Sequence, residues 1–168
     1  MTRQALELTI NGERHELMVE PHWSLLQVLR GELGMTGTKE NCLEAECGVC
    51  TVLLDGKAVN SCILLAEQCR GRSIVTIEGL GDPEHLHPLQ AAFIEQGAVQ
   101  CGYCTPGMIL AAKSFLDERP GHVPSEAEVR EALSGTLCRC TGYQKIVDAV
   151  IAAARQMNAR PEHARRAS

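Results

Sequence analysis

Four of the nine cysteines in this chain of 168 residues follow a spacing that suits an iron–sulfur cluster. Cys42, Cys47 and Cys50 are separated by four and then by two residues, and Cys62 follows after a short interval. A [2Fe–2S] cluster needs four thiolates, and in the plant-type spacing one loop supplies three of them. Zinc sites more often use two C-x2-C pairs or mixed cysteine and histidine ligands. We therefore predict that these four cysteines bind a [2Fe–2S] cluster.

A second set of four cysteines lies in the other half of the chain: Cys101 and Cys104, then Cys138 and Cys140. Each pair comes at or just before the predicted start of a helix, where backbone N–H groups and the helix dipole favour thiolates and an anionic cluster. The spacing also fits a four-thiolate zinc site, so the residues alone leave a cluster and zinc open. Cys101-Gly-Tyr-Cys104 has the form of a thioredoxin-type redox pair. Flanking helices in place of a βαβ unit disfavour dithiol chemistry.

Composition narrows the class of protein that must carry these thiols. Apolar residues make up 45% and aromatic residues only 3%, so the core must be aliphatic. The formal net charge of −5 argues against nucleic-acid binding. No apolar run is long enough to span a bilayer, and the first residues lack the apolar region of a signal peptide. With an odd number of cysteines, these features predict a cytoplasmic protein with reduced, metal-bound thiols.

The elements that must position the first cysteine set form a predicted α+β unit over residues 1–80. Strands 4–10 and 13–19 flank an Asn11-Gly12 turn, and strands 51–54 and 57–60 flank Asp55-Gly56. Ser24 is the expected N-cap of a helix that Gly34 ends. A last strand is expected over 73–77. The cysteine loop lies between this helix and the second hairpin.

Residues 81–158 follow a linker rich in glycine and proline and are predicted to be all-α, with four helices. The expected helices cover 89–96, 105–117, 125–133 and 145–157. Thr105 is the expected N-cap of the second helix, with Pro106 as its first helical residue. Ser125 and Glu128 form a capping box for the third. We expect residues 159–168 to be a flexible tail.

Together these motifs resemble the iron–sulfur subunit of the xanthine oxidase, or molybdenum hydroxylase, family. The resemblance covers about residues 4–157. It rests on four segments of the sequence: Gly37-Thr-Lys-Glu, Cys47-Gly-Val-Cys-Thr-Val-Leu-Leu-Asp-Gly56, Gln100-Cys-Gly-Tyr-Cys-Thr-Pro-Gly107 and Cys138-Arg-Cys-Thr-Gly-Tyr143. Many relatives have a first loop of the form Cys-Gly-Glu-Gly-Gly-Cys. This chain instead has Leu43, Ala45 and Glu46 where those glycines would fall.

The resemblance implies a β-grasp, plant-type ferredoxin-like domain followed by a four-helix domain, each holding one [2Fe–2S] cluster. It also implies a large partner subunit with molybdopterin and a medium one with FAD, as a dimer of heterotrimers, and no catalytic residue or substrate site in this chain. Electrons would pass from molybdenum through the second cluster and then the first to FAD. Gln100 and Cys140 match positions that approach the pterin. Relatives differ in substrate, which includes aldehydes, purines, N-heterocycles, carbon monoxide and an aromatic thioester.

Two other functions remain open on the residues alone. A stand-alone ferredoxin-like carrier would shuttle electrons between separate enzymes, although such a carrier needs only the first cluster. A structural zinc adaptor would use the same thiols without redox chemistry. The ninth cysteine, Cys69, is expected to be a buried apolar residue, not a ligand.

Overall fold

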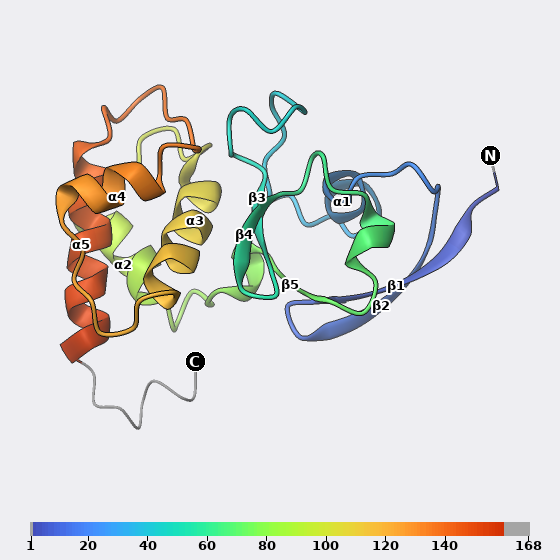
Figure 1. Ribbon diagram of the computed structural model, residues 1–168, viewed down its shortest axis with the longest axis horizontal. Helices are drawn as coiled ribbons and strands as arrows, with labels where there is room; N and C mark the ends of the chain where they lie inside the picture. Colours follow the sequence, from blue (N-terminus) through green and yellow to red (C-terminus); the bar gives the residue numbers. More distant parts are fainter. Residues whose placement is uncertain (1, 160–168) are drawn as a thin grey trace.

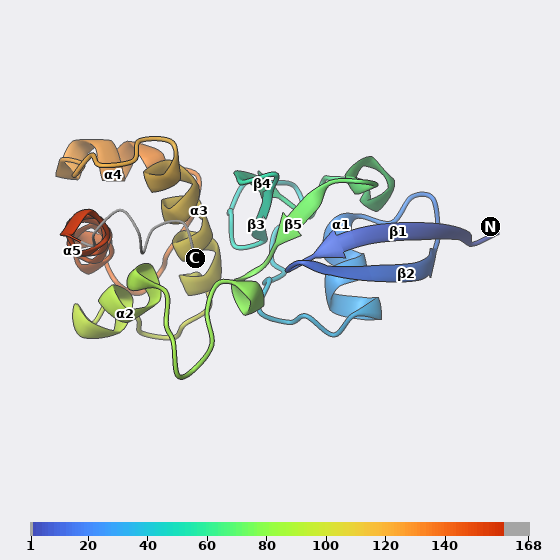
Figure 2. The ribbon, with the colours of Figure 1, turned by 90° about the horizontal axis from the view of Figure 1, so that it is seen from below.

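The computed structural model describes residues 2–159, which form a sheet-containing part and a helical part side by side (Figure 1). The N-terminal strands lie at the end of the molecule away from the helical part (Figure 1). The helix α3 (Thr105–Asp117) lies between the other long helices and the strand β3 (Thr51–Leu54) in both views of the ribbon (Figures 1 and 2). The predicted α+β architecture is confirmed.

Five strands form one mixed sheet with the order β2-β1-β5-β3-β4. The other strands are β1 (Gln4–Ile10), β2 (Glu13–Val19), β4 (Lys57–Asn60) and β5 (Ser73–Val75). The β1–β2, β3–β4 and β3–β5 pairs are antiparallel, whereas β1 and β5 run parallel. This order puts the two hairpins at opposite edges and joins them through β5.

Both predicted hairpin turns are confirmed, and their backbone explains why these residues form them. Asn11 and Gly12 have φ angles of 52° and 82°, and Asp55 and Gly56 have 50° and 81°. Two consecutive positive φ angles define the type I′ turn, which Asn-Gly and Asp-Gly favour. The register that results pairs Thr51 with Asn60, at the end of the hairpin nearest the cysteines.

The helix expected after Ser24 begins as predicted, but its form is different. Ser24 accepts a hydrogen bond from Gln27 N in a capping box, and the α-helical turn α1 covers only Leu25–Gln27. A π-helical turn, η1 (Val28–Glu32), continues it, because Leu33 N bonds back to Val28 O at 3.2 Å. Gly34, with φ of 66°, then ends the element as expected.

The last strand is shorter than predicted. β5 stops at Val75, and Thr76 N donates to Asn11 Oδ1 at 2.9 Å, so Thr76 bonds to the first turn and not to a neighbouring strand. Ile77 then opens a 3-10 turn, η3 (Ile77–Gly79), and a further 3-10 turn, η2 (Ala66–Cys69), precedes β5. Apolar side chains of β1, β3, β5, α1 and η1 pack together as the core of this part.

Four α-helices follow among the described residues: α2 (Pro88–Glu95), α3 (Thr105–Asp117), α4 (Glu126–Ala132) and α5 (Gln144–Ala159). The Ser125–Glu128 capping box is confirmed. The N-cap of α3 is Cys104, not Thr105, because Cys104 O accepts the first helical hydrogen bond, from Met108 N at 3.0 Å. Thus a predicted metal ligand itself begins a helix.

The helices enclose a second apolar core, which also receives two residues of the first cysteine loop. Leu89, Phe93, Met108 and Val150 are among the fully buried side chains of this core, and Cys47 and Val49 pack into it. α5 continues through Ala159, one residue into the predicted tail. The rest of that predicted tail, 160–168, lies outside the described residues.

Candidate metal centres

The first cysteine loop runs from the end of η1 to β3, and the second hairpin completes it. Cys50 directly precedes β3, and Cys62 comes two residues after β4 ends. The hairpin brings these two cysteines together, since Ser61 N and Ser61 Oγ both donate to Cys50 O, at 3.3 and 2.7 Å. Asn60 Nδ2 donates to Ala45 O at 3.0 Å and so ties the middle of the loop to β4.

Three residues of this loop have left-handed backbone angles. Gly48 has φ of 67°, and Leu43 and Ala45 have 62° and 64°. Leu43 and Ala45 are two of the positions where many relatives have glycine, the residue that adopts this region most easily. The loop therefore keeps the glycine-type conformation with side chains in place, and Leu43 is 53% exposed.

The thiols of the first set make two thiol–thiol contacts, Cys42 with Cys47 and Cys50 with Cys62. Cys47 also lies close enough to Cys50 to act on its pKa. Hydrogen bonds from the backbone of Glu44 and Cys47 lower the pKa of Cys42 to about 7. Burial raises the pKa of Cys50 to about 11. One thiol of this set is thus readily deprotonated, and another is kept from water.

The second set is built where α3 and α5 begin. Cys104 is buried at the N-cap of α3, and burial raises its pKa to about 12. Cys138 and Cys140 lie in the loop before α5. Burial acts to raise the pKa of Cys138, but hydrogen bonds from the Thr141 hydroxyl and backbone outweigh it, so the pKa is lowered. Thr141 N lies 3.4 Å from Cys138 Sγ.

These four thiols also form two pairs. Cys101 Sγ and Cys140 Sγ are 3.5 Å apart and both residues are exposed, while the Cys104 thiol interacts with Cys138. Cys138 N donates to the Tyr143 hydroxyl at 2.8 Å, which fixes the backbone at this predicted ligand.

Two pairs of thiols per set suit a binuclear cluster. Each iron of a [2Fe–2S] cluster takes two cysteines, while a four-thiolate zinc site gathers all four sulfurs around one ion. The four thiols of each set therefore form a donor set that fits a [2Fe–2S] cluster.

The loops of the two sets are in contact with each other, and they lie along the same edge of the molecule (Figure 1). Leu137 N donates to Cys47 O at 2.9 Å, so the neighbour of Cys138 bonds to a cysteine of the first set. A Cβ atom on Gly107 would lie 2.7 Å from Gly48 O, and one on Gly48 would lie 2.2 Å from Gly135 O. Glycine at these positions lets the two backbones touch.

Sequence comparisons agree with this arrangement. Residues 8–73 match the model of a 2Fe-2S iron-sulfur cluster binding domain, and residues 76–151 match that of a [2Fe-2S] binding domain. The nicotinate dehydrogenase small FeS subunit of Eubacterium barkeri is 48% identical over 89% of this chain and 94% of that protein. The nicotine 6-hydroxylase small subunit of Paenarthrobacter nicotinovorans is 46% identical over 92% of each chain. The chain belongs to the family of iron–sulfur subunits of molybdenum hydroxylases.

A solved structure extends the agreement to the fold of this iron–sulfur subunit. The crystal structure of quinoline 2-oxidoreductase from Pseudomonas putida 86 contains a chain that superposes with a TM-score of 0.88 at 46% identity, covering 94% of this chain and 97% of that one. The chain therefore carries two [2Fe–2S]-binding domains. No helix within residues 2–159 is long and apolar enough to cross a membrane.

Gln100, predicted from the resemblance to approach the pterin, is exposed beside the exposed Cys101. Cys140, the other predicted pterin contact, is exposed on the same site. Both residues therefore remain open to a partner at the second set. The sequence did not indicate that Tyr103 and Leu137 join the two sets, because each lies between or beside predicted ligand cysteines without a motif of its own.

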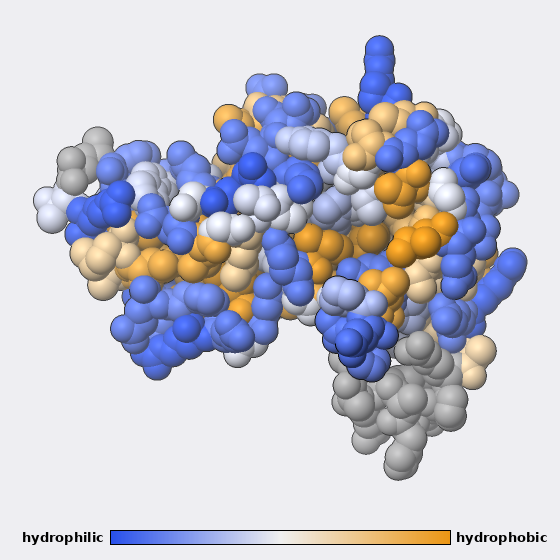
Figure 3. All heavy atoms as spheres, turned by 180° about the vertical axis from the view of Figure 1, so that it is seen from behind, coloured by the Kyte–Doolittle hydropathy of each residue, from blue (hydrophilic) through white to orange (hydrophobic). Residues whose placement is uncertain are grey.

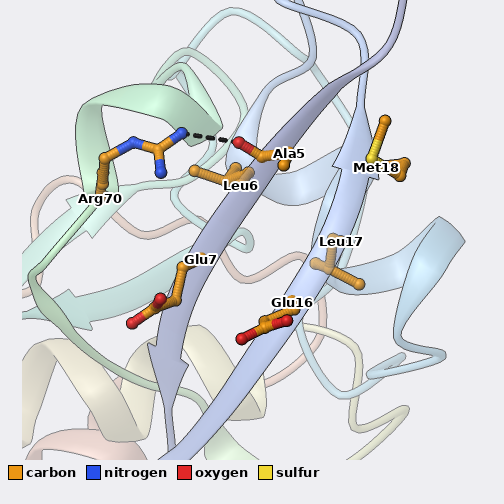
Figure 4. Close-up of a pocket in the computed structure, with 7 residues that line it drawn as sticks. All are labelled: Ala5, Leu6, Glu7, Glu16, Leu17, Met18 and Arg70. Carbon is orange, nitrogen blue, oxygen red and sulfur yellow. Dashed lines mark hydrogen bonds between the residues drawn. The ribbon is translucent and has the colours of Figure 1, made fainter.

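A depression of about 390 Å³ lies away from the cysteine loops, on the β1–β2 hairpin (Figure 4). Its apolar lining residues are Ala5, Leu6, Leu17 and Met18, and Glu7 and Glu16 line it from adjacent strands. Arg70 is held at its rim by Ala5 O at 2.9 Å and by Glu67. None of the cysteines lines this depression, so it is not part of either candidate metal centre.

Labelling of the cluster-free chain with iodoacetamide should modify Cys42 much faster than Cys69. The thiolate is the reactive form of cysteine. The pKa of Cys42 is lowered to about 7, while burial raises that of Cys69 to about 11. Since a lowered pKa means that the thiolate is lost as the pH falls through 7, labelling of Cys42 should slow about tenfold for each pH unit below 7. Mass spectrometry of timed samples measures this; equal labelling of the two cysteines would contradict it.

Cys69→Ala should leave the iron content unchanged, because Cys69 belongs to neither set. It is fully buried in the core of the sheet-containing part, and its thiol contacts Leu65 O. Loss of one buried sulfur should lower the free energy of unfolding by about 1 kcal/mol. Iron analysis and thermal unfolding check both expectations. Loss of iron in this variant would show that the ligands are wrongly assigned.

Proposed function

We propose that this chain is the electron-transfer subunit of a molybdenum hydroxylase complex. It relays electrons from a molybdopterin site in a large partner subunit, through two [2Fe–2S] clusters, to FAD in a medium one. The observation that supports this most is the presence of two sets of paired thiols whose loops touch each other. In the alternative, a stand-alone electron carrier, the second cysteine set would have no function.

Each cluster is assigned to one part of the chain. In residues 1–80, Cys42, Cys47, Cys50 and Cys62 would hold one cluster. In residues 81–158, Cys101, Cys104, Cys138 and Cys140 would hold the other. The clusters, when bound, accept and release one electron each. The chain sets their potentials through thiolate ligation, burial and hydrogen bonds to sulfur, such as that from Thr141 N to Cys138 Sγ.

The second set faces the pterin in this proposal, and the first set faces FAD. Gln100 and Cys140 are the contacts to the molybdopterin, since both are exposed at the second set. No residue of this chain has a catalytic role, and substrate is oxidised in the large subunit. We place the complex in the cytoplasm as a dimer of heterotrimers.

Exposed apolar side chains beside both sets support docking of two partners. Next to the first set, Leu43 and Ile63 are 53% and 62% exposed. Next to the second, Leu137 is 53% exposed. Apolar side chains also reach the surface over both halves of the molecule seen from behind (Figure 3). Exposed apolar groups at both cysteine sets fit a subunit that partner chains cover on two sides.

Affinity purification of the tagged chain from its native host tests the proposal. Two larger chains should co-purify, one with molybdenum and one with FAD. Nicotinate, xanthine or an aldehyde, the compounds for which relatives are named, should then bleach the cluster absorbance in the complex. Purification of the chain alone, with clusters that exchange electrons only with free carriers, would favour the stand-alone carrier.

A further inference from the structure

Tyr103 reaches from the second cysteine set to the loop of the first. It lies between Cys101 and Cys104, and its hydroxyl donates a hydrogen bond to Glu40 O, two residues before Cys42. Tyr103 is 45% exposed, so its hydroxyl is not placed there by burial of the whole side chain. The contact joins residues that are 63 positions apart in the sequence.

A second contact holds the other end of the same loop. Leu137 N donates to Cys47 O at 2.9 Å, and Leu137 precedes Cys138. Thus Glu40 and Cys47, which bracket Cys42, are both bonded to residues that adjoin ligands of the second set. Between these two anchors the loop has no helix or strand, and both Leu43 and Ala45 have left-handed φ angles.

We propose that Tyr103 is a positioning residue that holds the first cluster loop against the second, so that the separation of the two clusters depends on its hydroxyl. The inference rests on the proposed function only in that both sets hold clusters. Removal of the hydroxyl would break this bond. The loop would then keep the bond from Leu137 N to Cys47 O, beyond Cys42, and the bond from Asn60 Nδ2 to Ala45 O, which ties it to β4 and not to the second set.

Tyr103→Phe keeps the ring and removes only the hydroxyl. Tyr143→Phe is a matched control, because Tyr143 is the other tyrosine and its hydroxyl binds Cys138 N within the second set. Loss of a hydrogen bond of ordinary net strength raises the equilibrium constant for local opening of a loop by about 2- to 10-fold. Hydrogen–deuterium exchange of residues 40–47 in the full, cluster-loaded chain should therefore be faster by about that factor in Tyr103→Phe, whereas in Tyr143→Phe the faster exchange should be centred on residues 137–143.

Electron paramagnetic resonance measures the interaction between the two clusters, which a loss of stability alone would not change. In the fully reduced chain, the magnetic interaction between the two clusters should change in Tyr103→Phe, while iron content stays the same. Unchanged exchange at residues 40–47 together with an unchanged interaction would overturn the role of Tyr103. Failure of the proposed function would be seen separately, because the unmodified chain would then not bind two clusters. The exchange comparison would still decide whether Tyr103 anchors the loop.

Discussion

Cys50→Ser should remove the first cluster and interrupt the electron path. Cys50 is 2% exposed, follows the loop of Cys42 and Cys47, and has its carbonyl fixed by Ser61. Serine is a far weaker iron ligand because its hydroxyl does not ionise near neutral pH, and a buried site disfavours the charged form further. Iron should fall from about four to about two atoms per chain, with loss of one of two paramagnetic signals.

In the complex, the same variant separates the two halves of the reaction. Reduction of the molybdenum centre by substrate should persist, whereas reduction of FAD should be lost. Rapid-mixing spectroscopy of the complex follows both events. Cys69→Ala is the control, because it removes a cysteine of similar burial from the same part of the chain. Normal FAD reduction in Cys50→Ser would refute the proposed route.

Gly48→Ala should have the second large effect, on stability and on the contact between the two parts. Gly48 has φ of 67°, which costs a residue with a Cβ about 1–2 kcal/mol. Its Cβ would also lie 2.2 Å from Gly135 O and 2.9 Å from Thr136 Cα, both backbone atoms that cannot rotate away. Overpacking of this kind typically adds about 1–3 kcal/mol.

The backbone strain and the overpacking in Gly48→Ala together cost about 2–5 kcal/mol of folding free energy, which should lower the melting temperature by about 4–20 °C. Gly135→Ala is the matched control. It changes the partner of the same contact, but its Cβ would meet no atom within 4 Å and its φ is not left-handed. Thermal unfolding of the two variants side by side measures the difference. Equal melting temperatures would contradict the close packing of Gly48 against the helical part.

Local chemistry made much of the structure predictable. Asn11-Gly12 and Asp55-Gly56 identify both hairpins because type I′ turns demand these residues. Ser125 and Glu128 identify a helix start for a similar reason, since each caps the other's backbone. The cysteine spacing predicts two cluster-binding segments, and each lies within a matched 2Fe-2S binding domain. In each case the deciding interaction joins residues close in sequence.

Features that depend on tertiary packing were not predictable from the sequence. The π-helical turn of η1 and the early end of β5 follow from bonds that compete with regular structure, as when Thr76 bonds to Asn11. The contacts of Tyr103 with Glu40 and of Leu137 with Cys47 join distant segments, and no spacing pattern indicates them. Only the fold shows that the two cysteine sets share one interface.

The central claim is that this chain binds two [2Fe–2S] clusters, and metal analysis tests it most directly. Iron and acid-labile sulfide should be measured on the anaerobically purified protein, with low-temperature electron paramagnetic resonance after dithionite reduction. We expect about four irons, about four sulfides and two distinct signals per chain. Zinc bound by Cys101, Cys104, Cys138 and Cys140, with a single signal from about two irons, would contradict the two-cluster relay.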